Sequence, residues 1–189
     1  MDDLKKAKLE ANGWKVGSAE EFLYGTLYVD LDGVLAWWEK GANDMCEGVS
    51  FDDFPIETGD PKRDIIQDFM DDNYEFWSGI PRMPHFDKLW NAVKDHSPMI
   101  LTSPHDVKDE DCKRGKEDWC KKHLNLDSDR VLVKREKWHW AKDADGKPNI
   151  LVDDMDKNLD AWEEHGGIAI KVTEDNTDEV VKELSRYLK

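Results

Sequence analysis

The hydrophobic positions of the chain gather in short runs that are separated by longer polar stretches. Five of these runs have the length of a buried strand, and they cover residues 27–29, 99–101, 131–133, 150–152 and 168–172. Alternating strands and helices predict an α/β fold with a parallel five-stranded sheet that is flanked by helices. Apolar residues at helical spacing lie between the later runs: Phe86, Leu89, Trp90 and Val93, then Trp119, Cys120, His123 and Leu124, then Leu159 and Trp162.

Residues 37–84 differ from the rest, because they contain a helical pattern at Ile65, Ile66, Phe69 and Met70 but no strand pattern. We interpret them as a small helical cap inserted into a core of residues 25–36 and 85–189. Residues 1–24 are predicted to be an N-terminal extension. At the other end of the chain, Asn176 and Glu179 match a capping box, which predicts the start of a final helix.

The net charge and the cysteines indicate which partners are disfavoured and in which compartment the protein is expected. The formal net charge of −16 disfavours long DNA or RNA as a partner, because nucleic-acid binders carry basic surfaces. Cys46, Cys112 and Cys120 match neither a zinc motif nor a disulfide framework, as expected in a reducing cytoplasm. The sequence carries neither a secretory signal nor an apolar run of membrane-spanning length. We therefore expect a cytoplasmic protein without a membrane partner, and its oligomeric state stays open.

Two carboxylates follow the first predicted strand directly, where the chain reads Val29-Asp30-Leu31-Asp32-Gly33. In an open α/β sheet, ligands bind at the carboxyl ends of the strands. One of these two acids could attack phosphorus, and the other could protonate the leaving oxygen. The alternative is an Asp-Gly turn that has no chemical role.

Two further acids, Asp153 and Asp154, follow the fourth predicted strand. Adjacent acids at a strand end are costly unless a cation or hydrogen-bond donors offset them. Because Mg²⁺ prefers a few carboxylate oxygens together with water and phosphate oxygens, Asp30 and Asp153 are candidates for its ligands. The alternative is an acidic start of a helix.

Groups suited to phosphate follow the second and third predicted strands. Thr102 and Ser103 offer hydroxyls, and the basic stretch from Lys134 to Lys137 offers a cation for the transferring phosphoryl group. Together with the four acids, they supply the positioning and the charge neutralisation that phosphoryl transfer needs. The sequence therefore predicts phosphoryl-transfer chemistry at one edge of the sheet.

The order of these motifs resembles the haloacid dehalogenase superfamily of phosphohydrolases and, more narrowly, the 5′(3′)-deoxyribonucleotidases. The resemblance runs from about residue 27 to residue 162, and it is carried by DLDGVLAWWEKG, EFWSGIPRMPHFDKLWNAV, ILTSP, RVLVKREKW and ILVDD. It implies a Rossmann-like core with a small helical cap. It also implies Mg²⁺-dependent hydrolysis of a nucleoside monophosphate through an aspartyl-phosphate.

The resemblance further implies a role for each matching residue. Asp30 would be the nucleophile and a metal ligand, and Asp32 the general acid and base, with a backbone carbonyl that also binds the metal. Lys137, rather than Lys134, would be the catalytic lysine. Thr102 and Ser103 would bind the phosphate, and Trp38 would contact the nucleobase. Asp153 and Asp154 would belong to the metal site.

Alternatives to a nucleotidase stay open. The same chemistry could act on another small phosphorylated metabolite or on a nucleic-acid 3′-phosphate end, although the net charge disfavours the latter. A non-catalytic binding module on this fold would usually have lost one of the acids or the lysine. Lys113, Arg114 and Lys116 could help bind phosphate, but we interpret them as part of a solvated mixed-charge helix face with Glu110 and Glu117. Phe76 and Trp77 could line a base pocket, but we interpret them as cap core.

Overall fold

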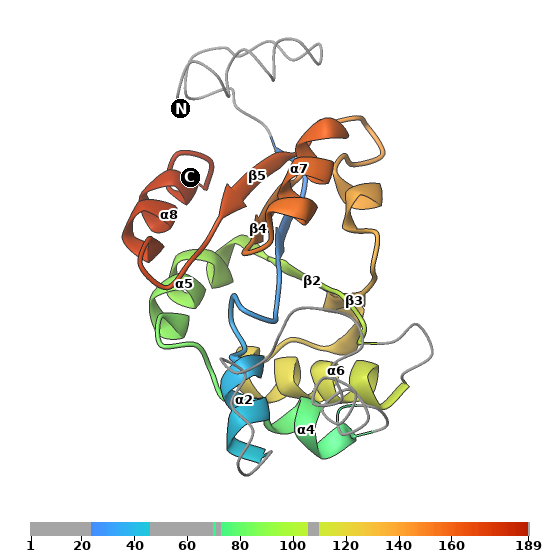
Figure 1. Ribbon diagram of the computed structural model, residues 1–189. Coiled ribbons are helices and arrows are strands. Elements are labelled where there is room, and N and C mark those ends of the chain that lie inside the picture. The colour runs from blue at the N-terminus through green and yellow to red at the C-terminus, as the bar shows by residue number, and fades with distance from the viewer. Residues whose placement is uncertain (1–23, 46–69, 71–72, 106–109, 189) are drawn as a thin grey trace.

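Five parallel strands form a single sheet in the order β3-β2-β1-β4-β5, with helices packed around it (Figure 1). The structure is a computed structural model that describes residues 24–45, 70, 73–105 and 110–188. The predicted α/β fold with a five-stranded parallel sheet is confirmed, although two strands extend one residue beyond the apolar runs, to Thr102 and Asp153. The strands are β1 (Leu27–Val29), β2 (Met99–Thr102), β3 (Val131–Val133), β4 (Ile150–Asp153) and β5 (Ile168–Lys171).

Strand β1 lies at the centre of the sheet, between β2 and β4. Val29 is opposite Ile100 on one side and opposite Val152 on the other. Because the strands are parallel, their carboxyl ends share one edge of the sheet. This register brings Asp30, which follows Val29, level with Asp153, which follows Val152.

Helices cover the sheet and connect its strands. None of the described helices combines the length and apolar character that a membrane crossing requires. The α-helices are α2 (Trp38–Met45), α4 (Tyr74–Gly79), α5 (Phe86–Val93), α6 (Glu110–Leu124), α7 (Asp156–Glu164) and α8 (Thr177–Leu184). The short 3-10 helices are η2 (Lys94–His96), η3 (Ser128–Arg130) and η4 (Lys137–Trp140).

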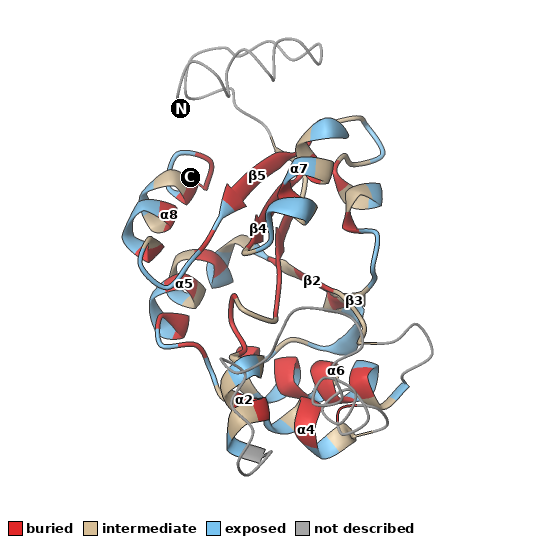
Figure 2. Ribbon diagram, viewed as in Figure 1, coloured by how far each residue is buried: buried red, intermediate tan, exposed pale blue. Residues whose placement is uncertain are grey.

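The strands are largely buried, as Figure 2 shows, which explains why their sequences are apolar up to the polar residues that end β2, β4 and β5. Val29 and Val152 belong to a larger core that includes side chains from α5, α6 and α8. Their neighbours Tyr28 and Leu151 point to the opposite face, into a smaller core around Trp162 of α7. The two cores together hold the sheet in place and fix the positions of its strand ends.

The described part of the predicted cap is helical and packs against α6. Phe76 and Trp77 of α4 are buried and belong to the larger core of the sheet, so they are core residues, and the cap as a separate unit stays a prediction. Gly115 of α6 allows the close approach, because a Cβ at this position would lie 2.5 Å from the Trp77 Cβ and 3.0 Å from the Ser78 nitrogen. Residues 1–23 and the predicted helical pattern at residues 65–69 lie outside the described residues.

The capping box predicted at the last helix is wrong in its detail. Helix α8 does begin directly after Asn176, but the Asn176 side chain makes no hydrogen bond to the start of the helix. Its Oδ1 accepts from the Thr173 nitrogen at 2.8 Å, and its Nδ2 donates to the Lys171 carbonyl at 3.0 Å. The side chain therefore stabilises the loop between β5 and α8.

Candidate active site

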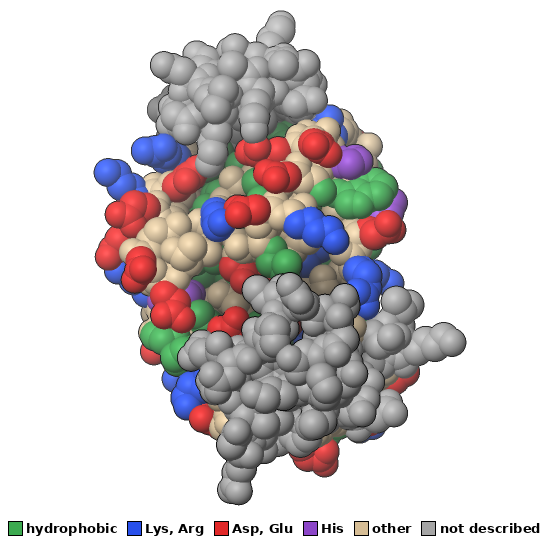
Figure 3. Space-filling view, in the orientation of Figure 1, with side chains coloured by type: hydrophobic (Ala, Val, Ile, Leu, Met, Phe, Trp, Pro, Cys, Tyr) green, Lys and Arg blue, Asp and Glu red, His purple; other side chains and the backbone are tan. Residues whose placement is uncertain are grey.

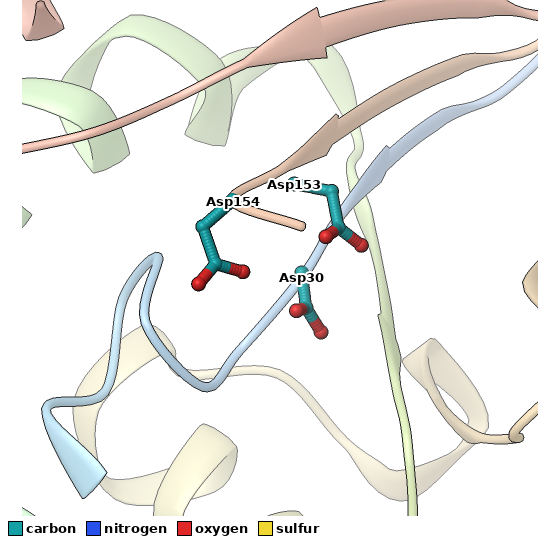
Figure 4. Close-up of side chains that lie close together, drawn as sticks. All are labelled: Asp30, Asp153 and Asp154. Atoms are coloured by element: carbon teal, nitrogen blue, oxygen red, sulfur yellow. The ribbon is translucent and has the colours of Figure 1, made fainter. Parts of the chain in front are cut away.

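The acids predicted from the sequence meet at the carboxyl edge of the sheet. Asp30 follows β1, Asp153 ends β4, and Asp154 follows it. Each of the three carboxylates offers an oxygen, and these oxygens lie within 4.8 Å of one another. Figure 4 shows that the three side chains face a common space from two neighbouring strands. The parallel pairing of β1 with β4 is the direct cause of this cluster.

A tight turn after Asp30 sets the position of Asp32. The Leu31 carbonyl accepts hydrogen bonds from the nitrogens of Val34, Leu35 and Ala36, which closes the chain on itself. Gly33 adopts a φ of 77°, a left-handed conformation that glycine tolerates without a steric penalty. A Cβ on Gly33 would lie 2.4 Å from Asp154 Oδ2. The glycine therefore makes room for the second acid of the Asp153-Asp154 pair.

Lys137 joins the acids of the two central strands. Its Nζ lies 2.7 Å from Asp30 Oδ1 and 2.7 Å from Asp153 Oδ2. The ammonium is buried, as are both carboxylates. The preference for Lys137 over Lys134 agrees with this geometry, because Lys134 is exposed. Helix η4 begins at Lys137 and directs it inward from the end of β3.

Lys116 of α6 is a second buried cation at the site, and the interpretation of this residue as solvated is wrong. Its side chain is 1% exposed, and Nζ lies 2.5 Å from Asp32 Oδ2. Nζ also donates to the Ser103 carbonyl at 2.6 Å and to Thr102 Oγ1 at 3.3 Å. The Thr102 hydroxyl lies 3.3 Å from the same Asp32 oxygen. Thr102, Ser103 and Asp32, all predicted site residues, are thus brought together by one lysine.

A sequence signal for Lys116 did exist. Cys112, Trp119 and Cys120 are buried on α6, and Lys116 lies four residues after the first and three before the second. That spacing places the lysine on the apolar face of the helix. A lysine there must find a buried partner, because an unpaired buried charge is costly.

Burial dominates the electrostatics of the acids. Burial raises the pKa of Asp30 to about 8, with the charges of Asp153 and Asp32 adding to the effect and Lys137 opposing it. Burial and the charge of Asp153 raise the pKa of Asp154 to about 6. The acids thus hold protons more strongly than free carboxyls do, and a cation that binds them must compete with those protons.

The two lysines respond in the opposite way to the same surroundings. Burial alone would lower the pKa of Lys137, but the charges of Asp30 and Asp153 and their hydrogen bonds outweigh it and raise the pKa. Burial likewise opposes the charged form of Lys116, and Asp32 raises its pKa above the usual value. Both lysines are therefore ammonium ions at neutral pH.

The donor set fits a hard divalent cation such as Mg²⁺. Four carboxylates face two ammonium groups, so a negative charge is left over in a mostly buried site. Asp154 Oδ1 and Asp32 Oδ1 are buried and have no hydrogen-bond partner among the residues that the structure describes, which is costly unless a ligand satisfies them. Carboxylate oxygens are the ligands that Mg²⁺ prefers. Asp30, Asp153 and Asp154 are the residues that could hold it.

Trp38 lies in a helix and not at the end of a strand. It begins helix α2, is half-buried and packs against the larger core. Its predicted contact with a nucleobase therefore stays a prediction. His105, which follows the Thr102-Ser103 hydroxyls, lies with its ring centroid 5.5 Å from that of Trp77, and Arg135 donates to its carbonyl at 3.1 Å.

Comparison with families of known proteins and with curated proteins finds no match to the chain. A function must therefore be inferred from the residues of the site.

Proposed function

We propose that the chain is a Mg²⁺-dependent phosphomonoester hydrolase that transfers the phosphoryl group of its substrate to Asp30. One observation supports this above all: acids and hydroxyls from the ends of adjacent strands meet two buried lysines, one from α6 and one from η4, at one edge of the sheet. Phosphoryl transfer needs this combination of a positioned nucleophile and charge neutralisation.

The first step forms a covalent intermediate. A carboxylate oxygen of Asp30 attacks phosphorus, and the bond between phosphorus and the ester oxygen breaks. Asp32 gives its proton to that leaving oxygen. Lys116 and Thr102 both contact Asp32 Oδ2, which leaves Oδ1 as the oxygen that faces the leaving group.

The second step returns the enzyme to its starting state. Asp32, now a carboxylate, takes a proton from a water molecule, and this water attacks the phosphorus of the aspartyl-phosphate. The bond between phosphorus and the Asp30 oxygen breaks, and inorganic phosphate leaves. Lys137 neutralises negative charge beside Asp30 through both steps.

Mg²⁺, when bound, would neutralise charge on the phosphate oxygens and favour the ionised form of Asp30. The residues of the chain supply the remaining requirements. Lys137 positions Asp30, Lys116 positions Asp32, and Gly33 leaves space for Asp154 beside the turn. Burial of these groups strengthens their electrostatic interactions with one another.

A small substrate is favoured over a polymer. On the face of the molecule in Figure 3, acidic and basic side chains of the described residues are interspersed and form no broad basic surface. Together with the net charge of −16, this disfavours a polyanion. A nucleoside monophosphate is the substrate class that the resemblance implies, and we adopt it.

A panel of phosphomonoesters tests the proposal. The purified chain is assayed for phosphate release from p-nitrophenyl phosphate, ribo- and deoxyribonucleoside 5′- and 3′-monophosphates, and sugar phosphates, with Mg²⁺ or with EDTA. We expect Mg²⁺-dependent release that is fastest with a nucleoside monophosphate. A preference for sugar phosphates would show that the substrate is not a nucleoside monophosphate. No phosphate release from any compound would reject the proposed activity.

A matched pair of variants tests the nucleophile. Asp30→Asn should lower kcat by at least about 1,000-fold, because the amide cannot attack phosphorus. Asp160→Asn is the control, since Asp160 is an exposed acid on α7 and should leave kcat unchanged. Substantial activity in Asp30→Asn would assign the nucleophile elsewhere.

A further inference from the structure

Asp153 is surrounded by hydrogen-bond donors on every side. Its Oδ1 accepts from the Met155 nitrogen at 2.8 Å and from Asn158 Nδ2 at 3.1 Å. Its Oδ2 accepts from Lys137 Nζ at 2.7 Å and from the same Asn158 nitrogen at 3.1 Å. The residue is fully buried, so protein donors alone fix the orientation of this carboxylate.

This arrangement separates the tasks of the two adjacent acids. A carboxylate offers about four lone-pair sites, and those of Asp153 already face protein donors. Asp154 instead keeps an oxygen that accepts no hydrogen bond from residues 24–45, 70, 73–105 or 110–188. Asp153 is therefore suited to hold Lys137, whereas Asp154 is suited to bind a cation.

Asn158 is a hydrogen-bond donor to Asp153 that comes from helix α7 and not from a strand end. It lies in the first turn of α7, and its backbone nitrogen donates to the Met155 carbonyl at 3.0 Å, which fixes the start of the helix. An ionised carboxylate only accepts hydrogen bonds, so the amide must present its nitrogen to Asp153. The nitrogen reaches both oxygens at equal distance and holds the carboxylate in one rotational position.

We infer that Asn158 is a positioning residue, which orients Asp153 so that Lys137 is held against the nucleophile Asp30. The contacts form one chain: Asn158 to Asp153, Asp153 to Lys137, and Lys137 to Asp30. The kinetic consequence of this inference rests on the proposed function. Without Asn158, the Asp153 carboxylate can rotate, and the ammonium is then free to leave Asp30.

Two variants and one control test the inference. Asn158→Ala removes the donor, and Asn158→Asp keeps the size of the side chain but replaces the donor by an acceptor. Lys157→Ala, at an exposed neighbouring position of α7, is the control. With p-nitrophenyl phosphate and Mg²⁺, we expect kcat to fall about 10- to 100-fold in both Asn158 variants, while KM changes less than about twofold. The control should keep the wild-type kcat.

The order of the two variants separates positioning from packing. If Asn158 only filled space, the isosteric Asn158→Asp would be the milder change. If its donor holds Asp153, Asn158→Asp should be at least as harmful as Asn158→Ala, because two carboxylates then face each other. A clearly milder Asn158→Asp would overturn the inference.

A measurement without substrate keeps this test independent of the proposed activity. The exchange of the Lys137 ammonium protons with water is followed by NMR in the metal-free protein. We expect exchange at least about tenfold faster in Asn158→Ala, because one of the two carboxylate partners is no longer fixed. Unchanged exchange would overturn the inference, whether or not the protein hydrolyses phosphomonoesters. An inactive wild type with this faster exchange would reject the proposed function alone.

Discussion

Two buried lysines reach the site from different parts of the molecule, and their surroundings differ. Lys137 pairs with Asp30 and Asp153, which lie at the ends of the central strands. Lys116 pairs with Asp32, and its Nζ also lies 4.8 Å from the ring centroid of Trp77 in helix α4. The Asp30 side of the site is thus enclosed by the sheet, whereas the Asp32 side also lies close to helix α4.

This difference assigns separate consequences to the two halves of the site. A change at Lys137 disturbs the attacking group and should slow every substrate. A change at Lys116 disturbs the proton donor Asp32 and should slow the substrates that depend on leaving-group protonation.

The largest effect is expected on stability when Lys137 is replaced. Lys137→Met leaves Asp30 and Asp153 buried beside each other without a cation, and loss of a buried partner costs about 3–5 kcal/mol. Lys116→Met should cost less, because Asp32 is 22% exposed and water can solvate it. Urea unfolding of the metal-free protein measures both values. Equal losses would show that water does not solvate Asp32 better than it solvates Asp30 and Asp153.

A substitution at Gly33 tests whether the backbone turn beside Asp154 is needed for Mg²⁺ binding. Gly33→Ala should cost about 1–2 kcal/mol for the left-handed conformation, and its Cβ would displace the Asp154 carboxylate. We therefore expect the increase in Tm on adding Mg²⁺ to disappear as well.

Gly146→Ala is the matched control for that change. Gly146 has a similar φ of 80°, but a Cβ there would meet nothing within 4 Å. The control should lose a similar free energy of unfolding and keep the full Mg²⁺ effect on Tm. An unchanged Mg²⁺ effect in Gly33→Ala would remove Asp154 from the metal ligands.

Substrates with different leaving groups distinguish the kinetic role of Lys116 from that of Lys137. In Lys116→Met, kcat/KM should fall about tenfold more for an alkyl phosphate than for p-nitrophenyl phosphate, whose phenolate leaves without a proton. In Lys137→Met, the two substrates should lose activity equally. The same ratio in both variants would contradict the assignment of Asp32 as general acid.

The pH dependence of Mg²⁺ binding is the smallest expected effect. The pKa of Asp154 is raised to about 6 and that of Asp30 to about 8, so protons compete with the cation at both ligands as the pH falls, and Kd should rise by at least about tenfold from about pH 7 to about pH 5. For the metal-free protein the sign is opposite: a raised carboxyl pKa makes folding less favourable as the pH rises through about 6. Calorimetric titration measures the first trend, and a Kd independent of pH would contradict it.

The sheet and its acids were predictable from sequence, because apolar runs followed by acids are local patterns. Lys116 was misread, because α6 is rich in charged residues and only the spacing from Cys112 to Trp119 separates its buried face from its exposed one. Asn158 carried no signal at all. Its contact with Asp153 depends on where α7 begins, and neither residue type reveals that a side chain from the helix will turn back onto the strand.

The pairing of β1 with β4 also has a consequence for the order in which the protein is assembled. Leu27 and Ile150, which lie opposite each other in the sheet, are far apart in the sequence, and contacts of such long range form slowly. During synthesis, Asp30 leaves the ribosome long before Lys137 and Asp153 exist. Asp30, the proposed nucleophile, is therefore among the first core residues to be synthesised and among the last to be paired with a cation. A chain released before Lys137 is made would keep the Asp30 carboxylate unpaired at the end of β1.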